Sequence, residues 1–470
     1  MIPRSAFLLA TAALLPLAAC APNLGKAPEI RSASSLAATT SLPDEGGAWP
    51  GDGWWKRYGD AQLDALIAEG LAGSPDIAAA AARLARAEGL ARSQGAPTGP
   101  TLTASGSGTI VRPLGSSGFG DDFSLGGWPK IASGSLGLSY ELDLWGKNHA
   151  RLRAALREVD AVRVEQAQAR LMLASSIAQA YADLAALYIS RDVAEQALRI
   201  QTDSSSLVAQ RVRSGLDTEG QRRQAAANVP AARADIAALD ERIALTRNQL
   251  AALIGAGPDR GLTIDRPKVG ALTPAALPAS ASIGLVGRRP DIVAARARVE
   301  AAAERIKVAH AAFYPDINLS ALVGLQVIDV PGLISGNASY FQGGPAISLP
   351  LFDNGKRDGD YRVSRGEYDS AVADYDRLLI DALRQVADAI TSRNALAVQV
   401  TAVRESLADS EEAYRIARLR YQGGLSPYLD VLSAEQAVIA IRRRDADLTA
   451  RAFTLDVALV RALGGGFAAA

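Results

Sequence analysis

Cys20, the single cysteine of the chain, is the residue best placed for covalent chemistry. It follows Arg4 and an apolar run over residues 6–19 that ends in two alanines. A positive start, a short apolar segment and small residues before a processing point predict a secretory signal peptide over residues 1–19. This run is too short to span a bilayer as a stable helix. Because the chain has no second cysteine, the thiol cannot form an intramolecular disulfide and is free for modification.

The segment Leu17-Ala18-Ala19-Cys20 resembles the bacterial lipobox. That resemblance implies cleavage before Cys20, a thioether-linked diacylglycerol on its sulfur and an acyl chain on its new amine. Two or three chains anchor a protein firmly, whereas a single chain binds marginally. Ala21 follows, in place of the aspartate that holds many bacterial lipoproteins at the inner membrane, and by resemblance this favours the outer membrane. The alternative is an ordinary signal peptide followed by an unmodified cysteine.

Residues suited to catalysis are scarce. The two histidines, His149 and His310, lie in helical patterns among alanine and arginine, where a lone histidine is more often a surface or packing residue than a catalyst. The sequence has no Cys/His cluster with metal spacing and no GxxxxGK phosphate loop. Its carboxylates fall mainly on long helical stretches and are typical of a solvated face. We therefore expect no enzyme activity, no metal and no cofactor apart from the lipid on Cys20.

Composition narrows the class of protein further. Aromatic residues make up only 5% of an alanine-rich chain, which favours long helices packed through small side chains. Lys+Arg and Asp+Glu both number 50, so the chain has no basic footprint for nucleic acid. Beyond the signal peptide there is no run of about 20 apolar residues of the kind that spans a bilayer as a helix. A membrane crossing by this protein would need strands.

Three pairs of similar segments occur in the same order and indicate an internal duplication. They are Ser74–Ile77 and Arg289–Ile292, Leu142–Lys147 and Leu349–Lys356, and Arg211–Leu216 and Arg420–Leu425. The period is roughly 210 residues, too long for a solenoid. We therefore predict a lipidated segment with a short helix over residues 20–72, then two repeats over 73–270 and 271–470. Each repeat contains a helix, two strands and two long helices.

Alternation of apolar and polar residues predicts the strands, at 101–111, 134–144, 316–327 and 345–352. In the second of these, Leu136, Leu138 and Tyr140 fall on one face and Ser139 on the other. Leu319 and Val323 are on the apolar face of the third strand and Asn318 is on its polar face.

Helical periodicity predicts the other elements. Helices of moderate length are expected at 75–96 and 290–313. Longer helices are expected from Gly146 to Arg213, without any proline, and through the region of residues 372–390. Returning helices follow at 219–254 and 428–463, ending at glycines. Pro230 should kink the first of these.

Four strands are too few to close a transmembrane barrel, for which about eight are the practical minimum. Open sheet edges in lipid would leave backbone groups unpaired. If the strands cross a membrane, subunits must pool them, with the apolar face toward lipid and the face of Glu141, Asp143 and Asn318 toward water. Loops 112–130 and 329–342 would then lie outside the cell. A soluble β-sandwich is one alternative. A periplasmic coiled-coil structural lipoprotein without a pore is the other, which explains the helices but not the alternating segments.

The motifs resemble those of TolC-family outer-membrane efflux ducts of the lipoprotein subtype, which is NodT- and OprM-like. The matching segments are Arg288–Arg296, Ala312–Ile317, Ser348–Asp353, Tyr421–Leu425 and Leu459–Gly466. The resemblance implies an α+β membrane protein that forms a homotrimer, with a 12-stranded transmembrane β-barrel above a long α-barrel in the periplasm. It also implies an outer-membrane exit duct for small molecules, working with an inner-membrane efflux pump and a periplasmic adaptor. In such assemblies the pump selects the substrate.

The turns between the long helices, at 213–221 and 422–430, are the expected periplasmic tips of the duct. By resemblance, Tyr421 and Asp430 match positions that help to close such a tip, and three copies of Asp430 would form a carboxylate ring. Ser426 stands where some members have an arginine, and Ser433 and Gln221 stand where some have further aspartates. We therefore expect an apolar plug of Leu425, Tyr428 and Leu429. The alternative is that Asp430 merely caps or solvates its helix.

Overall fold

The computed structural model forms two compact units. It describes residues 21–38, 40–110, 130–268, 276–279, 281–328 and 339–469. Unit 1 takes the described residues of Met1–Ile30, Ala85–Val162 and Ala295–Asp374, and unit 2 takes those of Arg31–Leu84, Arg163–Ala294 and Tyr375–Ala470. Cys20, the predicted signal peptide and most of the two predicted outer loops lie outside the described residues.

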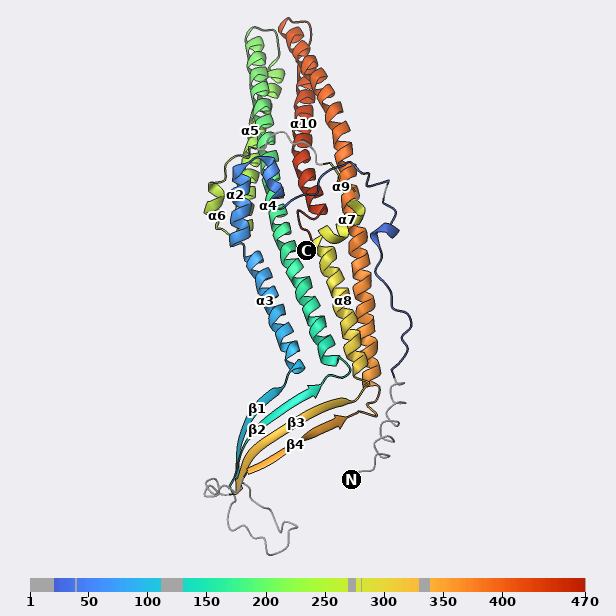
Figure 1. Ribbon diagram of the computed structural model, residues 1–470. Helices are drawn as coiled ribbons and strands as arrows, with labels where there is room; N and C mark the ends of the chain where they lie inside the picture. Colours follow the sequence, from blue (N-terminus) through green and yellow to red (C-terminus); the bar gives the residue numbers. More distant parts are fainter. Residues whose placement is uncertain are drawn as a thin grey trace, which may run out of the picture. The chain divides into compact units, whose positions relative to one another are not determined.

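Unit 1 contains one antiparallel sheet in the order β1-β2-β3-β4 (Figure 1). Its strands are β1 (Thr101–Ile110), β2 (Lys130–Leu142), β3 (Asp316–Ile328) and β4 (Ser339–Ser348). The central pair joins the two sequence repeats, because β2 pairs with β3 along twelve residue pairs from Ile131↔Ile328 to Leu142↔Ile317. Strands β1 and β4 are the edges, and neither has a second partner among the described residues.

The strand register separates an apolar face from a polar one. Residues paired across antiparallel strands share a face. Leu136 is opposite Val323, which in turn is opposite Phe341, and all three side chains are exposed. The other face carries pairs such as Ser139↔Ser320 and Thr103↔Gly137. No second sheet covers the apolar face within the described part of the chain, so the sandwich alternative is excluded there.

Two strands differ from the prediction by more than two residues at an end. Strand β2 begins at Lys130 rather than residue 134, and β4 spans Ser339–Ser348 rather than 345–352. Pro350 explains the early end of β4, because proline lacks the N–H needed for a ladder and restricts the residue before it. Pro345 is tolerated within β4, an edge strand of this sheet.

The helices of the two halves match in length. The chain forms α3 (Pro75–Gly95) and α8 (Pro290–Ala311), then α4 (Lys147–Arg213) and α9 (Lys356–Gln422), and finally α5 (Glu219–Leu253) and α10 (Tyr428–Ala462). Helices α4 and α9 each have 67 residues, and α5 and α10 each have 35. Helix α5 continues through Pro230. The matched lengths support the duplication that the motifs indicate.

Glycine ends the returning helices of both halves, as predicted. Gly255 has φ +80° and Gly464 has φ +93°, the left-handed region that glycine adopts without strain. After each glycine, a backbone N–H returns to a carbonyl of the last turn, from Ala256 to Ala251 and from Gly465 to Val460, which satisfies the helix end. A Cβ on Gly464 would lie 2.0 Å from the Arg288 carbonyl oxygen, so a side chain is excluded there.

Unit 2 holds the largest apolar core. Helix α2 (Ala61–Gly73) packs Leu63, Leu66 and Ile67 against side chains of α4, α5 and α10. Unit 2 also contains four short elements, η3 (Trp54–Tyr58), η2 (Ala33–Ser35), α6 (Pro258–Leu262) and α7 (Ala281–Arg288). In unit 1, η4 (Ala96–Thr98) leads from α3 into β1.

Arg289, in the motif Arg288–Arg296, connects three helices of unit 2. Its buried guanidinium binds Asp291 at 2.6 Å and donates to the Gln385 side chain and the Ala462 carbonyl. These contacts join the start of α8 to α9 and to the end of α10 within unit 2. Charge-assisted bonds of this kind are stronger than neutral ones, and they satisfy a helix carbonyl as well.

Helix α4 includes an 18-residue window that is long and apolar enough to cross a membrane, although 56% of it is buried in the fold. Core helices commonly pass this test, and Ile177 and Tyr181 of α4 are fully buried in the unit 2 core. We assign the part of α4 around these residues to that core.

The unit 2 core makes a stability prediction. Leu63 has no exposed surface, so Leu63→Ala should lower the free energy of unfolding by about 2–5 kcal/mol through lost burial and a residual cavity. Thermal unfolding followed by the helical signal in circular dichroism would show this as a lower midpoint. Leu262→Ala, at a side chain that is 74% exposed, is the matched control and should leave the midpoint unchanged. Equal midpoints for both variants would contradict the core assignment.

Candidate functional site

The polar face of the sheet continues onto the helices of unit 1 through Lys147. The Nζ atom of Lys147 lies 2.6 Å from Asp316 and 2.7 Å from Glu141, two carboxylates on the face that also carries Ser139 and Asn318. Burial lowers the pKa of Lys147, but the bonds to Asp316 and then to Glu141 outweigh it, so the pKa is raised overall. Lys147 therefore remains charged and marks the side of the helices that continues the polar face.

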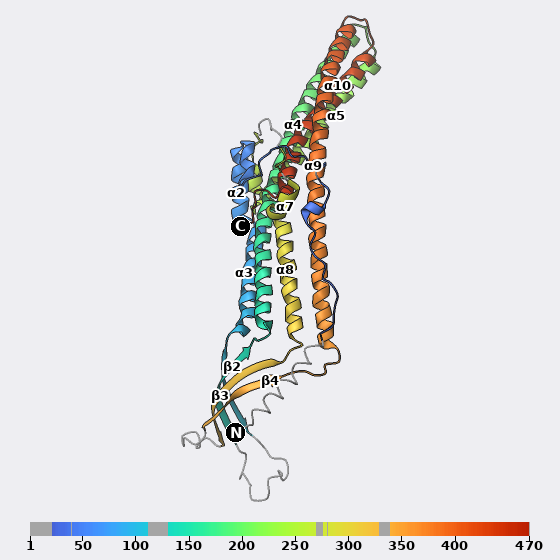
Figure 2. The same cartoon turned by 45° about the vertical axis from the view of Figure 1, so that its right-hand side comes forward.

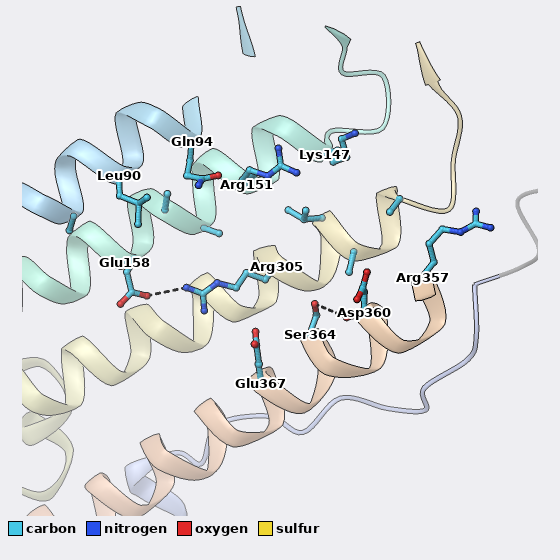
Figure 3. Close-up of a pocket in the computed structure, with 16 residues that line it drawn as sticks. Leu90, Gln94, Lys147, Arg151, Glu158, Arg305, Arg357, Asp360, Ser364 and Glu367 are labelled. Carbon is cyan, nitrogen blue, oxygen red and sulfur yellow. Dashed lines mark hydrogen bonds and ion pairs between the residues drawn. The ribbon is translucent and has the colours of Figure 1, made fainter. Parts of the chain in front are cut away.

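A groove of about 520 Å³ lies on that side of unit 1 (Figure 3). It is lined by α3, α4, α8 and α9, which run side by side in Figures 1 and 2. Alanines such as Ala154 and Ala309 form much of its floor, and Arg305 pairs with Glu158 at 3.3 Å across it. The rim carries charges of both signs, from Lys147, Arg151, Glu158, Arg305, Arg357, Asp360 and Glu367. A surface of small side chains with charges of both signs is suited to contact with water.

Both histidines serve structural contacts. His149 Nδ1 lies 2.5 Å from Asp143, which also accepts the backbone N–H groups of Asn148 and His149 at the start of α4. Burial raises the pKa of Asp143, but these hydrogen bonds outweigh it and lower the pKa overall. His310 lies among the rings of Tyr314 and Tyr361, at centroid distances of 5.6 and 5.8 Å. The described residues contain no group of side chains able to hold a metal ion.

The two helix hairpins of unit 2, α4–α5 and α9–α10, meet at their turns, seen together at the top of Figure 2. The Tyr421 hydroxyl donates to the carboxylate of Asp217. Arg211 Nε donates to the same carboxylate at 2.8 Å, and Arg211 Nη1 donates to the Tyr421 carbonyl at 3.0 Å. The Arg211 guanidinium also lies 4.5 Å from the centre of the Tyr421 ring, a cation–π distance. We call these three residues the tip triad.

The tip triad is shielded from water, which strengthens its polar contacts. Tyr421 is 1% exposed, and the side chains of Arg211 and Asp217 are 14% and 7% exposed. Burial, followed by the hydrogen bond to Asp217, raises the pKa of the Tyr421 hydroxyl. Tyr421 therefore keeps its proton and acts as the hydrogen-bond donor to Asp217.

The structure places the other predicted tip residues in two groups. Tyr428 is buried and packs with Tyr421 in a cluster with Val208, Ala225, Val431 and Leu432. Leu425 and Leu429 are 74% and 63% exposed, and Asp430 is also exposed. Tyr428 therefore packs inside its own chain, whereas Leu425, Leu429 and Asp430 are available to other surfaces.

A buried carboxyl lies just behind this cluster. Glu435 of α10 is 1% exposed, and it accepts a hydrogen bond from the Ser204 hydroxyl of α4 at 2.5 Å. Burial raises the pKa of Glu435, and the bond from Ser204 only partly opposes this. The buried hydroxyl of Tyr428 has no hydrogen-bond partner within the described part of the chain, and its pKa is raised to about 12 by burial and by the nearby Glu435.

Sequence reasoning did not identify Arg211, Asp217 and Glu435. One signal was available for Asp217, because it is a charged residue in the short turn between Gly215 and the helix cap Thr218. The duplication places Asp217 opposite Ser426 at a shift of 209 residues, the shift that relates the starts of α4 and α9. A charged residue in one repeat opposite a neutral residue in the other marks a position where the repeats differ in role.

Known proteins resemble this chain over most of its length. Residues 66–256 and 285–465 match the outer membrane efflux protein family. The multidrug resistance outer membrane protein MdtP of Escherichia coli K12 is 30% identical over 430 residues, covering 90% of this chain and 88% of that protein. The fusaric acid resistance protein FusA of Burkholderia cepacia is 35% identical over 327 residues, which cover 68% of this chain and 61% of that protein.

Solved structures share the fold. The outer membrane protein VceC of Vibrio cholerae has a TM-score of 0.84 at 40% identity, covering 89% of this chain and all of that one. The outer-membrane channel OprN has a TM-score of 0.85 at 26% identity, covering 95% of this chain and 99% of that one.

The expected fold of long helices with four antiparallel strands is therefore confirmed, and a coiled coil without a pore is ruled out. Channels of this family work in tripartite efflux systems and are not enzymes. The sheet, the helical hairpins and the family match lead to one conclusion: the chain belongs to the outer membrane efflux protein family and is an outer-membrane efflux channel of the TolC type.

Proposed function

We propose that three copies of this chain form a lipid-anchored duct that carries small molecules from the periplasm to the exterior. The observation that carries this proposal is the sheet, which has one apolar face, one polar face and two edges without partners among the described residues. Three such sheets would close a 12-stranded barrel by pairing β1 of each copy with β4 of the next, leaving no open edge in lipid. An inner-membrane pump and a periplasmic adaptor would complete the exporter.

The two sides of helix α9 (Lys356–Gln422) support an inner and an outer surface for the duct. Asp360 and Glu367 line the groove that continues the polar face of the sheet. At about 100° per residue, Arg365 and Asp369 point roughly 140–180° away from Asp360. Arg365 binds the N-terminal segment that follows Cys20, and a membrane tether must run outside a channel. The groove is therefore assigned to the lumen.

Cys20 is proposed as the lipid attachment site, and the mature chain is proposed to start there. Triacylation would hold the N-terminus in the inner leaflet of the outer membrane. Relatives of this chain are named for fusaric acid, for multiple drugs and for cations. Such varied cargo supports a duct that supplies a watery path for small molecules while its pump selects them.

The tip triad is proposed as the contact that keeps the periplasmic end of each copy closed. It ties the α4–α5 turn to the α9–α10 turn, and a duct that opens at this end must separate them. The exposed residues Leu425, Leu429 and Asp430 would approach their copies near the axis of the trimer. Tyr428 supports the tip from within its own chain.

The facing of the sheet is testable by a pair of neighbouring substitutions. Leu138→Arg places a charge on the apolar face and should cost about 2–4 kcal/mol at the membrane midplane. Ser139→Arg places the same charge on the polar face and should be tolerated or alter conductance. The measurement is the amount of trimer in outer-membrane fractions. Similar amounts for both variants would show that the facing assignment is wrong.

The tip triad predicts a change in channel opening. Asp217→Ala leaves Arg211 and the Tyr421 hydroxyl without their acceptor, at a cost of about 1–3 kcal/mol to the closed tip. Open probability in planar bilayers should rise about tenfold, since 1.4 kcal/mol corresponds to a factor of ten. Tyr421→Phe should act in the same direction, and Asp430→Ala combined with it should add to the effect.

Glu219→Ala is the matched control for the tip, because Glu219 lies two residues from Asp217 but pairs on the surface with Arg222 and Arg223. It should leave conductance unchanged. Normal conductance and normal antibiotic sensitivity for Asp217→Ala, at normal trimer levels, would refute the gate while leaving the duct intact.

Glu435 predicts a pH dependence of opening. A raised pKa means that the packed tip binds a proton more readily than a hydrated, open one. The closed tip is therefore fully stabilised below the ordinary carboxyl pKa of 4.5 and loses that stability as pH rises through the raised value. Open probability should therefore increase as pH rises above 4.5 and through the raised pKa of Glu435.

Glu435→Gln should remove this component of the pH response, because a neutral amide of the same size keeps the packing. Glu412→Gln on the exposed surface of α9 should keep the full response. A wild-type slope in Glu435→Gln would exclude Glu435 as its source.

A further inference from the structure

We propose that helix α9 carries a docking site for the N-terminal segment and that this site fixes how far the lipid on Cys20 can reach. The inference rests on the proposed lipidation of Cys20. The site consists of Arg365, Tyr368 and Asp369, and we call residues 21–31 the tether.

The site binds the tether through its main chain. Arg365 Nη1 donates to the Gly25 carbonyl at 3.2 Å and Nη2 donates to the Lys26 carbonyl at 2.6 Å. The Tyr368 hydroxyl donates to the Pro28 carbonyl at 3.0 Å. The planar guanidinium presents several donors in a fixed geometry, so one arginine can hold two successive carbonyls. These contacts fix the position of the tether along the helix, whatever its side chains.

Arg365 is held ready for this contact by its own helix. Its Nε atom binds Asp369 one turn later at 2.7 Å, and its side chain is only 15% exposed. Arg362, by contrast, pairs with Asp358, its side chain is 60% exposed, and it makes no hydrogen bond to the described tether residues.

The tether runs parallel to α9. Residue numbers rise together along both segments, since Gly25 and Lys26 contact Arg365 and Pro28 contacts Tyr368. The residues before Gly25 therefore lead toward Lys356, where α9 begins after the sheet. This is the direction in which a lipid on Cys20 must reach the membrane.

The chain between Cys20 and the docking site is only slightly longer than the distance it must cover along α9. The five residues from Cys20 to Gly25 span at most about 17 Å when extended. Arg365 lies nine residues beyond Lys356, about 13.5 Å along the helix axis. The lipid can therefore just reach the level where the helices give way to the strands. Docking would hold the anchor at this boundary.

Proteolysis tests the docking site without reference to lipid. Trypsin cleaves after Lys26, and the carbonyl of that bond is the one that Arg365 binds. In the purified full-length protein, Arg365→Ala should speed this cleavage about tenfold. Arg362→Ala is the matched control and should not change it. An unchanged rate for Arg365→Ala would overturn the docking site.

A suppression experiment tests the reach. Deletion of residues 22–24 shortens the tether by about 10 Å, so the lipid should no longer reach the boundary while the tether is docked. We expect a several-fold loss of trimer in the outer membrane, restored when Arg365→Ala and Tyr368→Phe release the tether. Arg362→Ala should not restore it.

Mass spectrometry separates this inference from the proposed lipidation. An N-terminal peptide without acyl chains would refute lipidation, and the reach inference with it, while the proteolysis result would stand. Triacylated variants in which release of the tether restores nothing, or in which the deletion causes no loss, would overturn the reach inference alone.

Discussion

The unpaired backbone at the two edges of the sheet is the constraint on which the structure depends. In lipid, each unpaired N–H or C=O group costs several kcal/mol, and β1 and β4 both present such groups. One chain with four strands cannot remove these edges by itself. The apolar face adds the same demand, because Leu136, Val323 and Phe341 have no covering layer among the described residues. In the proposed trimer, closure between copies would pair the edges and lipid would cover the apolar face, so both demands would be met only in an assembled, inserted barrel.

The long helices have the same lengths in both repeats, and many of their side chains are alanine. Helices α4 and α9 have equal lengths, as do α5 and α10, so each hairpin turns at the corresponding residue, Gly215 or Gly424. Both glycines have φ near +70°, and the chain reverses direction at the same place in both repeats. Equal hairpins bring their tips level with each other, and residues from different repeats can therefore meet there. The tip triad is the result of that match.

Much of this architecture could be predicted from the sequence because it depends on local pattern. The alternation of apolar and polar residues predicted the bounds of β1 and β3 to within one residue. Helical periodicity without proline predicted α4. The end of β4 was misplaced because Leu349 and Leu351 continue the apolar alternation past Ser348, although Pro350 prevents pairing. The partner of Tyr421 was missed because Asp217 is about 200 residues away in sequence, and no local pattern encodes a contact between repeats. Burial of Tyr428 within its own chain has the same origin.

The two apolar clusters of unit 2 differ in a way that suits a channel. Around α2, Leu63, Ile177, Leu250 and many other side chains are buried together, whereas the tip cluster contains only a few, among them Tyr421 and Tyr428. Free energy from burial scales with the apolar area removed from water, so the core resists separation far more than the tip does. The tip instead relies on hydrogen bonds to the carboxylate of Asp217. Each such bond makes a modest net contribution to stability, because water can take the place of either partner. A region held in this way can open while the core stays folded.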